Sequence, residues 1–325
     1  MKIYIFQRIV LAIVSLFIII SITFVLMAAL PGQFGLDDIE DPIIREMLIE
    51  RYGLDRPIHE RYFIYLRNIV TRGDLGMSTT LYPRWDVTEI ILGRMPITLQ
   101  LNLFASVLVY PIGLGLGIVM ALKKDTYIDT SLSVFVVIFI SVPVFVVAAL
   151  MQYFLAFRLE WFPLLLSVWR PNEWVMNWEK FHSMILPILA LSFGGIMNLA
   201  RNMRGELAEA LTSDFMLLAK TKGLSHMQAT MRHALRNSFL PMTGIVISTF
   251  VFLLSGSLFI ERQFGIPGLG GLLIRAIQVV DIPVALGWMM VFTSINLISI
   301  LVTDILYGVV DPRVRIGGKQ GEANE

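Results

Sequence analysis

Long apolar runs without charge alternate with short polar connections along most of this chain. A helix needs about 20 apolar residues to cross the hydrocarbon core of a bilayer. Six stretches are close to or above this length: residues 9–30, 96–122, 130–157, 183–200, 237–260 and 282–310. The first is longer than the roughly 7–15 apolar residues of a cleaved signal peptide, so we expect it to persist. The pattern predicts an all-α polytopic membrane protein with six transmembrane helices.

Three features interrupt these stretches. We expect Pro143 to kink the third one, because proline removes a backbone hydrogen bond. Asp304 lies near one end of the sixth, where a carboxylate costs less than at the bilayer centre, and a packing contact is favoured over a proton relay. Residues 261–281 are apolar but too glycine-rich at their start to cross. A turn and a short helix at residues 272–277 are expected there, with Arg275 near the lipid headgroups.

Residues 31–95 are the least apolar part of the chain and contain helix start signals. Asp41-Pro42 offers a cap followed by a proline at the first helical position, and Asp86 with Glu89 has capping-box spacing. We expect a small helical insertion between the first two spans. Its 11 acidic residues outnumber its 8 Lys and Arg, so a solvated surface is favoured over a site for an anionic partner.

A hydrophilic, basic segment at residues 214–241, here called the basic island, separates the fourth and fifth stretches. Gly223 interrupts a helical pattern. Ser225 then precedes Gln228 by three residues, the spacing of a capping box, so a new helix should begin near His226.

Apolar residues recur along this short helix at three- and four-residue steps, which predicts one apolar stripe on a cationic helix. They are Leu224, Met227, Met231 and Leu235. Two interpretations remain open: the helix rests on lipid headgroups, or it docks a cytoplasmic protein. Gly223 and Asn237, which we expect to fix its two ends, favour docking.

Composition and motifs exclude several kinds of chemistry. Hydrophobic residues make up 56% of the chain and charged residues 16%, the net charge is +1 and there is no cysteine. Gly318-Lys319, the Gly-Lys pair of the chain, is followed by Gln and lacks the upstream glycine of a phosphate loop. No nucleophile elbow or metal-ligating His pair occurs. We therefore expect no catalytic residues, no metal site and no nucleic-acid partner.

Charges in the short connections predict the orientation, because Lys and Arg concentrate on the cytoplasmic side. Residues 123–125 carry two lysines, residues 201–236 carry six Lys and Arg against three acids, and residues 311–325 carry three basic residues. Both termini and the basic island are therefore expected in the cytoplasm, with residues 31–95 outside.

Several motifs along the chain occur in a recognisable order. They are SVP at 141–143, DFM at 214–216, AKTKGL at 219–224, HALRN at 233–237, GIPGLG at 265–270 and DPRVR at 311–315. In this order they resemble the permeases of ABC importers, in the dipeptide, oligopeptide and nickel subfamily. Most importer permeases begin the loop with Glu-Ala-Ala; this chain has Leu217-Leu218-Ala219, and the subfamily also departs from the glutamate.

The resemblance implies the type I ABC importer permease fold. Its parts would be an N-terminal transmembrane helix (1–30), an extracytoplasmic helical insertion (31–95), a permease core (96–310) with a cytoplasmic coupling loop (201–237), and a cytoplasmic tail (311–325). It implies a transport subunit, not an enzyme, in a bacterial or archaeal inner membrane. The implied partners are a second homologous permease, two ABC ATPases that bind the ATP and Mg, and an extracytoplasmic substrate-binding protein.

The resemblance also assigns candidate residues. The ATPase-coupling set is Ala219, Gly223, Leu224, Ser225, His226, Met227, Gln228, Met231 and His233. Uncharged polar residues that could line a pathway, or equally pack helices, are Gln100, Asn102, Asn198 and Asn296. Short peptides are the implied substrate, with nickel chelates, glutathione or oligosaccharides as alternatives. A secondary transporter without ATPase is the alternative of another class, but it would be expected to show inverted repeats or several intramembrane charges.

Overall fold

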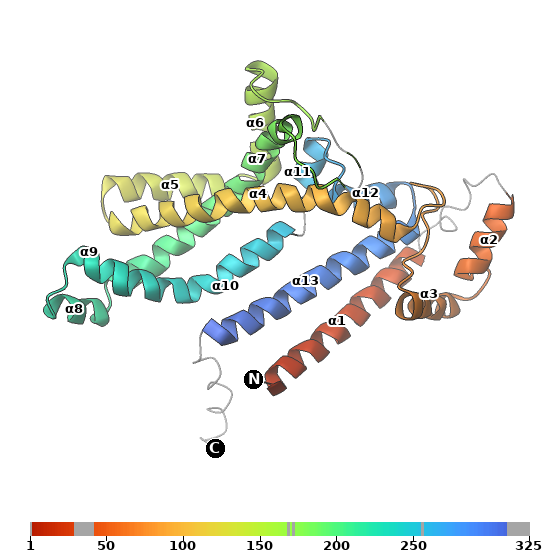
Figure 1. Ribbon diagram of the computed structural model, residues 1–325, viewed down its shortest axis with the longest axis horizontal. Coiled ribbons are helices and arrows are strands. Elements are labelled where there is room, and N and C mark those ends of the chain that lie inside the picture. The colour runs from red at the N-terminus through yellow and green to blue at the C-terminus, as the bar shows by residue number, and fades with distance from the viewer. Residues whose placement is uncertain (1, 29–41, 168–169, 171–172, 255–256, 311–325) are drawn as a thin grey trace.

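The computed structural model describes residues 2–28, 42–167, 170, 173–254 and 257–310, and the described residues are mainly helical (Figure 1). The first four helices are α1 (Lys2–Ala28), α2 (Pro42–Tyr52), α3 (Ile58–Arg72) and α4 (Val87–Leu122). The middle of the chain forms α5 (Tyr127–Ser141), α6 (Val144–Met151), the π-helical η2 (Gln152–Arg158) and α7 (Trp178–Leu211). Then follow α8 (Asp214–Thr221), α9 (His226–Ala229), the π-helical η3 (Thr230–Ala234) and α10 (Leu235–Leu254). The last three are α11 (Leu258–Gln263), α12 (Leu269–Gln278) and α13 (Ile282–Val310).

Within the described residues, four helices are long and apolar enough to cross a membrane: α1, α4, α7 and α13. The third predicted stretch is a fifth only if α5 and the α6–η2 segment count as one broken span, because they meet at 99°. The prediction of a kink at Pro143 was therefore too mild. Proline pushes the residue before it into an extended conformation, and Val142 has φ −82° and ψ 126°, which ends the helix.

The fifth predicted stretch was wrong at both ends. Residues 258–260, placed in that span, belong to the separate helix α11. The short helix of the basic island was expected to end near Asn237, but α9 continues through η3 into α10, and the residues at both junctions have right-handed helical backbone angles. Asn237 is therefore an interior residue of one helical segment over residues 226–254.

In the described part of residues 31–95, α2 and α3 are helical, and α4 begins within the range that was assigned to the insertion. Asp86 caps α4 by accepting a hydrogen bond from the Thr88 N–H at 2.7 Å; this differs from the predicted capping box with Glu89. Residues 87–95 consequently belong to α4. At the far end of the chain, α12 begins at Leu269, three residues before the predicted start, and α13 follows with its predicted bounds.

The core of the structure is the packing of α4 along α7. The Ser192 hydroxyl donates to the Ala105 carbonyl, and further along, an added Cβ on Gly113 and on Gly117 would meet α7 backbone atoms. Residue numbers rise in the same direction on both helices from one contact to the next, so α4 and α7 run parallel. A Cβ on Gly117 would lie 2.6 Å from the Ala200 carbonyl oxygen, so glycine permits this close approach.

Gly117→Val is expected to destabilise the chain by at least the roughly 1–3 kcal/mol of an overpacked core, because the new side chain meets backbone that cannot move aside. Gly115→Val is the matched control, since a Cβ there meets nothing within 4 Å. Thermal unfolding of the two detergent-solubilised variants measures the difference. Equal midpoints would contradict this account of the α4–α7 contact.

Candidate functional site

The basic island lies at one end of the bundle, on an extension of α7. The helix continues 11 residues past Ala200, the predicted end of the fourth span, which carries it roughly 16 Å further at 1.5 Å per residue. Figure 1 shows α8 and α9 at this end, whereas α2, α3 and α12 lie at the opposite end. The island thus lies at the end of the bundle, and its inward-facing residues pack against the main core.

The turn between α8 and α9 has the predicted local structure. Gly223 has φ +87°, a left-handed backbone conformation that glycine adopts without strain and other residues adopt only with strain. The space around it is open, since an added Cβ would meet no atom within 4 Å. Ser225 and Gln228 form the reciprocal capping box: the Gln228 backbone N–H donates to the Ser225 hydroxyl, and the Ser225 backbone N–H donates to Oε1 of the Gln228 side chain. Both features fix the direction in which α9 leaves the turn.

The predicted apolar stripe is divided in the structure. Leu224 and Leu235 are half-buried against the main core, whereas Met227 and Met231 are 63% and 61% exposed. Leu224 therefore contacts the core, and its expected place on a docking face stays a prediction. Ala219 is also buried, with α8 turning it and Met216 inward.

Exposed apolar side chains remain on both sides of the turn. They are Leu217, Leu218, Met227 and Met231, here called the apolar patch. Leu217 and Leu218 occupy positions at which the more usual Glu-Ala motif would be polar or small, and they were not predicted to be part of the site. His226 and His233 are exposed beside the methionines. The patch has the composition of a surface that another protein covers.

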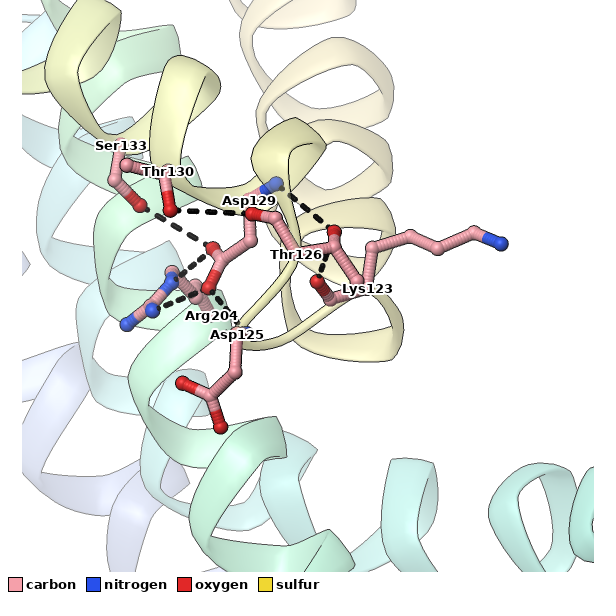
Figure 2. Close-up of polar contacts among 7 residues, drawn as sticks. All are labelled: Lys123, Asp125, Thr126, Asp129, Thr130, Ser133 and Arg204. Atoms are coloured by element: carbon pink, nitrogen blue, oxygen red, sulfur yellow. Dashed lines mark hydrogen bonds and ion pairs between the residues drawn. The ribbon is translucent and has the colours of Figure 1, made fainter.

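A buried carboxylate ties the α4–α5 turn to α7 close to this end (Figure 2). The Arg204 guanidinium donates from Nε and one Nη to the two carboxylate oxygens of Asp129, at 2.6 and 2.7 Å. Asp129 also accepts from the Asp125 N–H and the Ser133 hydroxyl, and it is 2% exposed. We call this pair the Asp129–Arg204 clamp. Sequence reasoning missed it because the two residues are 75 positions apart.

Asp129→Asn is expected to lower stability, because it leaves Arg204 without its bidentate acceptor. Removing one partner of a buried pair costs roughly 3–5 kcal/mol, and Arg204 is partly exposed, so we expect the lower end of that range. Asp125→Asn, at an exposed left-handed position that asparagine tolerates, is the control. Thermal unfolding should separate the variants; similar midpoints would show that the clamp contributes little.

The four predicted pathway residues have different surroundings. Gln100 is buried and donates to the Trp174 carbonyl at 2.7 Å, and Asn102 is 1% exposed with both amide atoms unpaired. Asn198 is half-buried and accepts from Asn202, and half-buried Asn296 donates to Phe292 in its own helix. Their role in a pathway stays a prediction. Among the described residues, no group of three His, Asp or Glu side chains could hold a metal ion.

Comparison with known families defines the class of protein. Residues 113–316 match the family described as binding-protein-dependent transport system inner membrane component, and residues 1–102 match the N-terminal part of such membrane components. The chain therefore belongs to the family of inner-membrane components of binding-protein-dependent transport systems. This confirms the resemblance drawn from the motifs.

Relatives that match nearly the whole chain are named as peptide permeases. The dipeptide transport system permease protein DppB of Lactococcus lactis is 37% identical over 96% of this chain and 99% of its own length. DppB of Bacillus subtilis is 31% identical over 94% of this chain and 95% of its own length. The oligopeptide transport system permease protein OppB of Salmonella typhimurium is 32% identical over 96% and 99% of the two chains.

Proposed function

We propose that this chain is the permease subunit of an ATP-driven importer that takes up dipeptides or oligopeptides delivered by an extracytoplasmic binding protein. The similarity over nearly the full length of dipeptide and oligopeptide permeases supports the peptide substrate. Nickel chelates, glutathione and oligosaccharides are the alternatives within the subfamily.

Energy would come from partner proteins. The chain has no phosphate loop, so two ABC ATPases would bind ATP and Mg and hydrolyse the nucleotide. A second homologous permease would complete the pathway, with six spans in each permease. Loop charges support placing the basic island and both termini in the cytoplasm.

The observation that carries this assignment is the apolar patch on a projecting, basic end of the chain. Full burial of an apolar side chain of this size contributes about 1.5–3 kcal/mol, so a groove on an ATPase that covered Met227 and Met231 would hold the island firmly. The rigid turn at Gly223 would transmit the movement of such a partner into α9 and α10. This supports a coupling role for the island over a role in resting on lipid headgroups.

Met227→Asp is expected to release the ATPases, because it replaces an apolar contact that the ATPase would bury with a charge that has to be desolvated. A loss of at least about 3 kcal/mol corresponds to more than a hundredfold in affinity. Pull-down of the ATPases from membranes, with transport measured in parallel, tests this. Tyr127→Asp is the control, since Tyr127 is 93% exposed at the α5 end that lies beside the Asp129–Arg204 clamp. Wild-type recovery of both ATPases with Met227→Asp would contradict the coupling assignment.

The orientation is tested with single cysteines, which this cysteine-free chain allows without background. Lys124→Cys, in the exposed α4–α5 turn, should be protected from an impermeant thiol reagent in intact cells. Val70→Cys, which replaces a side chain 82% exposed on α3, should be labelled under the same conditions. Labelling of both positions from outside would exclude the proposed topology.

A further inference from the structure

A cavity of about 240 Å³ lies between α11, α12 and the start of α4. Figure 1 shows α12 and the start of α4 away from α8 and α9, which carry most of the apolar patch. Three arginines, Arg94, Arg262 and Arg275, and one carboxylate, Glu261, line it. A water molecule occupies about 30 Å³ in the liquid, so the space equals that of roughly eight waters. That is enough for one amino-acid residue with its terminal groups.

The Glu261 carboxylate of the cavity already accepts hydrogen bonds from within the chain. The Thr98 hydroxyl donates to Glu261 Oε1 at 2.9 Å, and the Gly271 N–H, at the start of α12, donates to Oε2 at 3.1 Å. Gly268 and Gly270 press so closely on this carboxylate that a Cβ would lie 2.6 and 2.9 Å from its atoms. Burial raises the pKa of Glu261 to about 7, so part of the population carries no negative charge near neutral pH. Glu261 consequently serves the packing of the loop, and no ion pair joins it to Arg94 within the described residues.

The three arginines have N–H groups available to donate to a ligand. Arg94 is 4% exposed and donates to the Tyr82 hydroxyl and, at 3.5 Å, to the Gly268 carbonyl, which uses two of its five N–H groups. Arg262 and Arg275 are exposed, and neither forms an ion pair with another residue of the described chain. With three guanidinium groups against one carboxylate, the wall of the cavity is positive and offers planar donor pairs. This chemistry matches a carboxylate.

We propose that this cavity binds the C-terminal carboxylate of a peptide entering the transporter, held by Arg262 and Arg275 at the rim with Arg94 at the base. The inference rests on the proposed function and names a subsite for it. A peptide importer meets ligands with every kind of side chain, so recognition has to use groups that all of them share. The free carboxylate is such a group, and the volume admits the terminal residue.

The test compares a tripeptide with its C-terminal amide, which has the same shape but lacks the negative charge. Uptake of both is measured in proteoliposomes that contain the complete transporter, with a saturating concentration of its binding protein. R262Q/R275Q is compared with wild type. R72Q/R158Q is the matched control, because it removes two positive charges from exposed positions on other elements. Any preference of the binding protein cancels when the variant and wild-type rates are divided for each peptide.

We expect R262Q/R275Q to lower uptake of the free acid by at least about tenfold, the equivalent of one charge-assisted hydrogen bond, and to leave uptake of the amide within about twofold of wild type. Equal losses for both peptides would overturn the proposal. If binding protein above the concentration that saturates wild type then restored both, its acidic side chains would be the occupant. If a change from anionic to neutral lipid abolished the effect, the occupant would be a headgroup. No loss for either peptide would also overturn it. Absence of uptake by wild type would instead refute peptide import itself.

Discussion

The parallel contact between α4 and α7 is the constraint on which the rest of the structure depends. Without side chains at Gly113 and Gly117, the two backbones approach until the α7 carbonyls lie against α4. Inside a membrane the hydrophobic effect does not drive helices together, because lipid tails are as apolar as the helix surfaces. Close packing of this kind is therefore a main source of helix association. At 36 and 34 residues, both helices are longer than a bilayer requires, and each therefore extends beyond the packed region.

The two ends of this helix pair carry the two regions of chemical interest. Thr98 and Arg94 on α4 hold the loop of α11 and α12, and Arg204 on α7 holds the start of α5 through Asp129. From Arg204 the chain reaches α8 after a break of only two residues, Thr212 and Ser213. A partner that displaced the apolar patch would thus act on α7 through nearly continuous helix. Since α7 packs on α4, and α4 carries Arg94 and Thr98, the same displacement would also move residues at the positive cavity at the other end.

The sequence was sufficient for features that depend on neighbouring residues. The capping box of Ser225 and Gln228, the left-handed turn at Gly223 and the bounds of α13 all follow from local signals. Features that depend on distant residues were missed. Glu261 and Thr98 are 163 positions apart, and no local pattern marks either as a buried partner.

The continuation of the helix through Asn237 illustrates the same limit. Asparagine is a weak helix former and favours helix ends, so it suggested a boundary. In the structure, Ala229 and Ala234 are fully buried on the side of this segment that faces the core, and that packing outweighs the preference of one residue. Leu217 and Leu218 were not predicted to belong to the site, because no local signal shows which face of α8 is covered; the structure turns Met216 and Ala219 inward and leaves both leucines exposed.

A positive cavity apart from neutral buried residues suits what a peptide importer has to distinguish. The neutral residues Gln100 and Asn102 are buried within the chain, so neither presents a charge that would select among side chains. Strong selection inside the pathway would exclude most peptides, whereas recognition of a terminal group at the entrance excludes none of them. If the cavity lies at the entrance, as proposed, its fixed positive charge would also raise the local concentration of anionic ligands, because enclosure by protein strengthens the field relative to open water. Selectivity for a common group and tolerance of variable side chains are therefore compatible when they are placed in different parts of one chain.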